Sequence, residues 1–467
     1  MKGLIKNRQA IICILKDKLR VFAADHGVIA VSLLRRLAVV GPRLLYLNLL
    51  MMEHRFEHNG PHARRLTALV KKRLPECIEA LPKLIGPNPH TFNDNTTYLR
   101  AITLRAPRWE GGQVRRGVLL IKFTETFRFF YHNIDIARLM RYFHIVLEPS
   151  WSGYCLPEIL LWARFPEPIV VQASEPLDRQ FLSDLGANLI PTEIGASDWV
   201  DHRVFHPLGG EKTFDVIYVA NLTPMKRVNV YLRAVSELVR LRPGFRAALV
   251  VSSFGGNEQE FAQLLRWYGI GSQLTVLMNQ TQSQLNDIIN KSRVSILLSR
   301  KEGSNKTLFE SMFAGTPVIL LRNNIGVNKD YINEHTGRLT DESQLVSTIL
   351  EFVDGRIRTT PREWAIENIS AERSTQKLEK VLRDVGMADP AVDAPLFVKM
   401  NTPEATYKDA DVARRMPNIA DVLRNFAASS HFSQAEIDER LQTLFDPVPQ
   451  SSLDRQALPP DPDVSIL

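Results

Sequence analysis

Short apolar runs alternate with segments of helical periodicity through most of the chain, and this alternation predicts its fold. Apolar runs bounded by turn signals predict buried strands, and apolar residues three or four positions apart predict helices. The predicted strands are residues 117–123, 144–148, 169–173 and 189–191 before Pro207, and residues 214–220, 247–252, 273–278, 294–298 and 317–321 after it. Strands that alternate with helices form parallel sheets with right-handed crossovers. The fold class is therefore α/β, with two Rossmann-like domains facing a cleft, the second built on five strands.

This pattern divides the chain into four parts. Residues 1–95 are predicted to be a helical and irregular N-terminal extension, because prolines break their second half. Residues 96–207 and 208–386 hold the two Rossmann-like domains. Residues 387–467 form a C-terminal extension, and its proline-rich end from Asp446 to Leu467 is predicted to be disordered.

Charge and cysteine content restrict the classes of partner. A net charge of +7 suits an anionic ligand or a membrane surface. The chain has no nucleic-acid-binding motif, so we expect no nucleic-acid partner. Cys13, Cys77 and Cys155 are too scattered for a disulfide framework or a zinc site, which favours a reducing, cytoplasmic location.

The apolar stretch from Val28 to Met52 has two interpretations. Arg35, Arg36 and Arg43 interrupt it, so it lacks the run of ~20 apolar residues that a spanning helix needs. It is either a helical packing element or a basic amphipathic segment that lies on a membrane. The second interpretation predicts a peripheral contact at the inner membrane face.

The segment from Lys301 to Glu310 carries the strongest chemical signal. It lies between a predicted strand and an amphipathic helix, and Ser304 and Asn305 are expected near the N-cap of that helix. Ligands of open α/β sheets bind at the carboxyl ends of strands, where a helix N-terminus suits a diphosphate. Glu302 in the turn and Glu310, expected about two turns into the helix, provide two acceptors for a polyhydroxylated ligand.

These residues, followed by Ala314-Gly-Thr-Pro-Val-Ile319, resemble the Glu-(seven residues)-Glu signature of family-4-type (group 1) retaining glycosyltransferases of the GT-B fold. The resemblance covers roughly residues 115–385 and is most specific over residues 200–340. It implies a nucleotide-diphospho-sugar donor in the second domain and an acceptor in the first.

The resemblance also implies roles for single residues. Glu310 would accept hydrogen bonds from the donor ribose, and Glu302 would contact the transferred sugar as a catalytic residue. The backbone of Gly303, Ser304 and Asn305 would face the diphosphate, with Lys306 adding charge.

The segment from Asn221 to Arg227 resembles the family's first diphosphate loop. Lys226 keeps the family lysine and would stabilise the leaving diphosphate as the second catalytic residue, with Arg227 beside it. Asn221 stands where the family has an arginine, so it can donate a hydrogen bond to phosphate but brings no charge.

The first domain departs further from the family pattern. Family members usually carry a glycine-rich loop after the first strand, whereas this chain has Thr124-Glu125-Thr126. Trp151 is a candidate for stacking on a sugar, and Glu148 and Glu175 are candidates for orienting an acceptor hydroxyl.

The predicted function is therefore glycosyl transfer, hexosyltransferase-like and with retention of anomeric configuration. The resemblance implies no metal and no cofactor besides the donor. The acceptor stays open among saccharides, lipid-linked molecules and small molecules. A catalytically weak or inactive GT-B-fold binding protein and a nucleotide-sugar epimerase are the alternatives.

Overall fold

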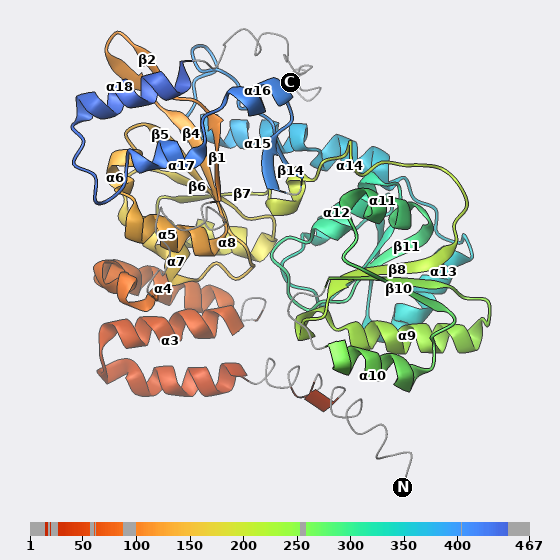
Figure 1. The fold of residues 1–467 in the computed structure, drawn as a ribbon. Coiled ribbons are helices and arrows are strands. Elements are labelled where there is room, and N and C mark those ends of the chain that lie inside the picture. Colours follow the sequence, from red (N-terminus) through yellow and green to blue (C-terminus); the bar gives the residue numbers. More distant parts are fainter. Residues whose placement is uncertain are drawn as a thin grey trace, which may run out of the picture.

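The computed structural model describes residues 15–16, 19, 27–56, 60, 62–86, 100–252, 258–402 and 404–446. It contains two α/β units, each built on its own sheet and covered by helices (Figure 1). The predicted fold class of two Rossmann-like domains is therefore confirmed. The predicted disorder of the proline-rich tail concerns residues that, apart from Asp446, lie outside the described ranges.

The first sheet has five strands in the order β1-β4-β5-β6-β7. Its strands are β1 (Ala101–Arg105), β4 (Gly117–Lys122), β5 (Phe143–Glu148), β6 (Ile169–Gln172) and β7 (Leu189–Thr192). Strands β4 to β7 run parallel, and β1 pairs antiparallel with β4. A separate hairpin joins β2 (Arg108–Glu110) and β3 (Gln113–Arg115).

Alternation along each strand divides this sheet between two cores, because successive side chains point to opposite faces. Leu119 and Ile121 pack with the helices on one face, and Val118 and Leu120 pack in the core of the other face. The helices and 3-10 turns of this part of the chain are α5 (Thr124–Asn133), α6 (Ile136–Leu139), α7 (Pro157–Leu160), η4 (Leu161–Arg164), α8 (Pro176–Leu185) and η5 (Ala196–Trp199).

The N-terminal helices extend the first of these cores. Their bounds are residues 27–37, η1 (Ala38–Val40), α3 (Arg43–Phe56), α4 (Ala63–Cys77) and η2 (Ile78–Leu84). Leu47 and Leu50 of α3 and Val70 of α4 are buried with the first sheet, so these two helices are part of the first domain's core. Among the described residues, no helix combines the length and the apolar character that crossing a bilayer requires.

The second sheet has six parallel strands in the order β10-β9-β8-β11-β12-β13. They are β8 (Phe214–Asn221), β9 (Ala247–Ser252), β10 (Leu274–Met278), β11 (Ser292–Leu297), β12 (Val318–Leu321) and β13 (Gly337–Thr340). The prediction of five strands was wrong because β13, an edge strand, has little apolar content. The chain runs outward from β8 to β10 and then returns to the other side of β8 at β11, which creates a switch point.

Helices pack around this sheet and continue beyond it. They are η6 (Pro224–Lys226), α9 (Val228–Leu241), α10 (Glu258–Tyr268), α11 (Gln282–Asn290), α12 (Lys306–Phe313), η7 (Lys329–Tyr331), η8 (Glu342–Gln344), α13 (Leu345–Val353), α14 (Pro361–Ile369) and α15 (Ala371–Asp384). Leu378 and Leu382 of α15 are buried against the first sheet. The predicted unit 208–386 therefore includes a helix that packs on the other domain (Figure 1).

The predicted C-terminal extension also packs on the first domain. Its elements are β14 (Lys399–Thr402), β15 (Glu404–Tyr407), α16 (Ala410–Arg415), α17 (Ile419–Arg424) and α18 (Gln434–Phe445). Met400 joins the core on the α15 side of the sheet, whereas Phe426 and Leu441 join the core on the opposite side. The segment thus wraps around the edge of the first domain (Figure 1).

A buried ion cluster attaches β14 to the ends of β4 and β5. Lys399 forms an ion pair with Glu148, and the Lys122 ammonium lies 3.6 Å from the same carboxylate and 2.8 Å from the Asn401 side chain. Burial alone would raise the pKa of the Glu148 carboxyl, but Lys399 and Lys122 outweigh it and lower that pKa. Burial lowers the pKa of the Lys399 amine to about 7, with Glu148 opposing.

We expect Glu148→Gln to destabilise the protein more than Lys399→Met. The first change leaves two buried ammonium groups without a carboxylate, which costs about 3–5 kcal/mol when a buried pair is broken. The second change leaves Glu148 beside Lys122. Urea unfolding measures both, with Asp384→Asn, which breaks an exposed pair with Lys380, as the control. A Glu148→Gln variant no less stable than that control would contradict the prediction.

Candidate active site

The sequence signals of the second domain converge where β8 and β11 end. These strands are parallel neighbours, with Ser295 opposite Ile217 and Ile296 opposite Tyr218. Their carboxyl ends therefore lie side by side at the switch point of the sheet, where ligands of such sheets bind. The loop after β8 carries Lys226, and the loop after β11 carries Glu302.

Backbone contacts hold the turn around Glu302 in place. The Glu302 N–H donates to the Ile325 carbonyl at 2.8 Å, next to a bridge between Lys301 and Ile325. Asn305 caps α12, because its side-chain oxygen accepts from the Leu308 N–H at 3.3 Å. The first N–H groups of a helix lack acceptors within the helix, so this terminus attracts anions.

Lys226 and Glu302, the two predicted catalytic residues, form an ion pair with each other. Both side chains are largely buried, at 16% and 7% exposure. The Lys226 carbonyl also accepts a hydrogen bond from the buried Tyr218 hydroxyl, which attaches the loop to β8. The pair places one cation and one carboxylate together, and Glu302 precedes the first residue of α12, Lys306, by four positions.

Glu310 is more deeply buried than its predicted role suggests. It lies just over one turn into α12, not two, and it is only 7% exposed. Burial raises the pKa of its carboxyl to about 7, and the nearby Lys306 ammonium opposes that rise. Within the described part of the chain, the structure shows no hydrogen bond or ion pair to this carboxylate.

Asn221 and Arg227 shape the loop after β8. The Asn221 side-chain oxygen accepts from the Thr223 N–H at 3.1 Å and from its hydroxyl at 2.6 Å. Arg227 adopts a left-handed conformation with φ of 52°, and its guanidinium donates to Glu342 at 2.7 Å. Both side chains predicted to bind the donor are therefore engaged in contacts within the second domain.

The Glu302 turn also contacts the first domain. A Cβ atom added to Gly303 would lie 1.7 Å from the Ser150 carbonyl oxygen, so no larger residue fits there without movement. The Ser152 N–H donates to the Glu302 carbonyl at 3.3 Å, and the Ser304 hydroxyl accepts from the Ser197 N–H at 3.0 Å. Ser304 thus joins the domains through its side chain.

The first-domain candidates separate into free and engaged side chains. Trp151 is 44% exposed on the loop that touches Gly303. Glu175 caps α8 by accepting from the Leu177 and Asp178 N–H groups at 2.8 and 3.1 Å. Glu148 belongs to the buried ion cluster with Lys399. Trp151 is therefore the candidate best placed to meet an acceptor.

The expected glycine-rich loop is replaced by a direct turn from β4 into α5. Phe123 makes this turn with φ of 65°, a value that a bulky side chain rarely adopts. The Arg100 guanidinium lies over its ring, 4.6 Å from the centroid. Such strain persists only when surrounding contacts enforce it, and it is common at functional sites.

Two further charged groups lie near the interface, and the sequence analysis gave neither of them a role. Burial lowers the pKa of the Lys301 amine, and Asp178 opposes this shift. Burial raises the pKa of the Asp198 carboxyl to about 7, and the Tyr331 hydroxyl of the second domain donates to it at 3.2 Å. No sequence motif marks Asp198, so only the packed fold identifies it as an interdomain contact.

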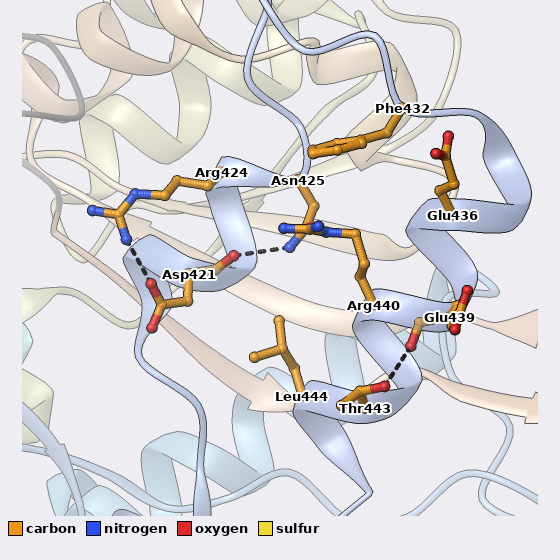
Figure 2. A pocket seen from close by; sticks show the side chains of 9 residues that line it. All are labelled: Asp421, Arg424, Asn425, Phe432, Glu436, Glu439, Arg440, Thr443 and Leu444. Carbon is orange, nitrogen blue, oxygen red and sulfur yellow. Dashed lines mark hydrogen bonds and ion pairs between the residues drawn. The ribbon is translucent and has the colours of Figure 1, made fainter.

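A cavity of about 560 Å³ lies elsewhere, between α17 and α18 (Figure 2). Arg424 pairs with Asp421, and the Arg440 guanidinium lies over the Phe432 ring and donates to Asn425. These charged side chains therefore have partners within the cavity wall. The cavity lies on the first domain, away from β8 and β11 (Figure 1).

The part of the chain that the structure describes holds no group of three or more His, Cys, Asp or Glu side chains placed to bind a metal ion. Metal independence nevertheless stays a prediction, to be tested with a chelator.

Comparison with known proteins assigns this region to a family. The profile described as "Glycosyl transferases group 1" matches residues 204–370. A curated relative, D-inositol 3-phosphate glycosyltransferase 2 of Catenulispora acidiphila, is 27% identical over 114 residues. That match covers 23% of this chain and 27% of the relative, so the chain spans about a quarter of the relative's length.

Solved structures resemble the chain more loosely. A sucrose-phosphate synthase from Thermosynechococcus elongatus aligns with a TM-score of 0.46 and 18% identity, over 58% of this chain and 74% of that one. Anabaena HepE in complex with UDP and glucose aligns with a TM-score of 0.46 and 16% identity, over 56% and 77%. Residues 204–370, which contain Lys226, Glu302 and Glu310, match the family of glycosyl transferases group 1.

Proposed function

We propose that this chain transfers a sugar from a nucleotide-diphospho-sugar donor to an acceptor hydroxyl, with retention of anomeric configuration. The observation that carries the proposal is the ion pair between Lys226, after β8, and Glu302, after β11, inside the residues that match group 1. The name of the curated relative, a glycosyltransferase, supports the same class of reaction.

The geometry supports one arrangement of the donor. A diphosphate at the α12 N-terminus would meet the backbone N–H groups of residues 303–305 and the Lys226 ammonium. The ribose would then lie toward Glu310, whose buried carboxylate lacks a partner within the described residues and can accept its hydroxyls. The transferred sugar would lie toward Glu302.

The reaction needs charge stabilisation more than covalent help. The bond between the anomeric carbon and the diphosphate oxygen breaks through an oxocarbenium-like state, and its electron pair leaves with the nucleoside diphosphate. Lys226 and the helix N-terminus stabilise that developing charge, while Glu302 faces the positive charge on the sugar. The acceptor oxygen then attacks the face from which the diphosphate departs, and its proton passes to the departing diphosphate oxygen.

The acceptor is proposed to bind against the first domain, where Trp151 offers an exposed ring beside Gly303. Its class stays open among saccharides, lipid-linked molecules and small molecules. We propose a cytoplasmic location, where nucleotide sugars are the donors, and neither a metal nor a further cofactor.

A non-catalytic binding protein of the same fold is the second candidate. Two observations favour it. Phe123 makes a strained turn where the family usually carries a glycine-rich loop. The side chains of Asn221 and Arg227 already bond to Thr223 and Glu342 of the same domain. Release of a nucleoside diphosphate, dependent on an added acceptor, separates the two functions. Thermal-shift screening of nucleotide sugars comes first, because a ligand of the native state raises its apparent stability.

The first prediction concerns Lys226→Met. Removing the cation that faces the leaving diphosphate should lower turnover roughly a hundredfold to a thousandfold, the effect of losing one such stabilising group. The change also leaves Glu302 buried and unpaired, so it should lower stability. The double variant Lys226→Met/Glu302→Gln should recover that stability but not the turnover.

Turnover at saturating donor and urea unfolding, measured on the same samples, separate these effects. Arg242→Met is the matched control, because it removes an exposed ion pair with Asp354 at the far end of α9. Wild-type turnover should persist in the presence of a chelator. Unchanged turnover in Lys226→Met, or a strict requirement for a divalent ion, would contradict the proposed mechanism.

The second prediction concerns the pH dependence caused by Glu310. Its folded-state pKa of about 7 lies above the ordinary 4.5, so the folded protein retains this proton between these values. The resulting stability is fully present below about pH 4.5 and is lost as the pH rises through 7. We expect Glu310→Gln to remove this dependence, to stabilise the free protein above pH 7 by about 3 kcal/mol, and to weaken donor binding.

Two measurements test this prediction. Unfolding from about pH 4 to about pH 8 covers both pKa values of Glu310, and donor titration measures binding. Glu237→Gln, an exposed change on α9, should alter neither. The assignment fails if Glu310→Gln binds the donor as well as the wild type does.

A further inference from the structure

The helix of residues 27–37 has an apolar outer side, in addition to the buried Val31 on its inner side. Its buried side carries a charge, because Arg35 forms an ion pair with Glu53 of α3 and donates to the Tyr46 hydroxyl at 3.1 Å. Its outer side is apolar, with Ile29, Leu33 and Leu37 one turn apart along the helix. A surface helix in water normally shows the opposite arrangement.

This outer side is well exposed. Leu33 is 57% exposed and Leu37 is 75% exposed, and Leu34, Val39 and Leu45, close to them in the sequence, are exposed as well. The helix forms the outermost layer of the molecule, beyond α3 and away from the first sheet (Figure 1). Contiguous apolar surface of this kind marks an interaction site.

Charge identifies the kind of partner. The first 95 residues hold 16 Lys and Arg against 7 Asp and Glu, a net charge of +9, whereas the whole chain has +7. Arg36 and Arg43 are exposed beside the apolar surface. Two copies of such a segment would repel each other, while an anionic bilayer would attract it and accept its leucines.

We propose that this face, defined by Ile29, Leu33, Leu34, Leu37 and Val39 with Arg36 and Arg43, docks on an anionic lipid bilayer. The helix lies in the interfacial plane with its leucines among the acyl chains and its arginines at the headgroups. The buried Arg35–Glu53 pair holds the helix to α3, so docking requires no unfolding of the first domain.

Flotation of the full chain with vesicles tests this surface without any sugar donor, so its result is independent of the proposed reaction. We expect binding to phosphatidylcholine vesicles that contain phosphatidylglycerol, and at least about tenfold weaker binding to phosphatidylcholine alone or at high salt. Leu33→Glu/Leu37→Glu should reduce binding by about tenfold or more, because two apolar side chains leave the bilayer. Arg36→Glu/Arg43→Glu should reduce only the preference for the anionic lipid.

The matched control is Leu208→Glu/Leu241→Glu, which changes two exposed leucines of the second domain and should bind like the wild type. Thermal unfolding confirms that each variant is folded. The proposal is overturned if the wild type does not float with anionic vesicles, or if the Leu33/Leu37 variant floats equally well. It is also overturned if the wild type is a dimer that this variant converts to a monomer, since the face then binds a second copy.

Discussion

The close approach of Gly303 to the Ser150 carbonyl is the contact on which the candidate site depends. Because no side chain separates them, the loop after β11 lies directly against the loop after β5. The hydrogen bond from the Ser152 N–H to the Glu302 carbonyl follows from the same approach. Glu302 is therefore held by contacts with both domains.

The strands that the sequence predicted share one property, which is a nearly continuous apolar run. Strands buried on both faces need such runs, and the sequence predicted β4 to β7 and β8 to β12. The strands β1 (Ala101–Arg105) and β13 (Gly337–Thr340) were not predicted. Thr103 and Arg105 interrupt the apolar residues of β1, and Gly337 and Arg338 leave β13 with a single apolar residue.

Only those features of the site that depend on the order of neighbouring elements along the chain could be predicted. The strand–turn–helix order placed Glu302 and Lys226 at strand ends, but their pairing requires that β8 and β11 be neighbours, which depends on the order of the whole sheet. The partner of Glu148 could not be predicted at all, because Lys399 follows it by 251 residues. The burial of Glu310 likewise depends on the packing of α12, which spacing alone does not reveal.

Glu310 illustrates how this protein departs from ordinary burial rules. A buried carboxylate without a partner destabilises the free protein, and such groups cluster at sites where a ligand supplies the missing contact. The ion cluster of Glu148, Lys122 and Lys399 is different, because its charges satisfy one another. The first arrangement suits the donor site proposed for Glu310, and the second holds the C-terminal segment on the first domain.

The helix α3 connects the two surfaces on which function would depend. Its Glu53 holds the outer apolar helix through Arg35. Its Arg55 lies beside Gly153, whose added Cβ would be 3.8 Å from the arginine and 3.2 Å from the Lys301 amine. Glu53 and Arg55 both lie in the last turn of α3 (Arg43–Phe56). The outer helix and the Gly153 loop are therefore both attached to the same end of α3.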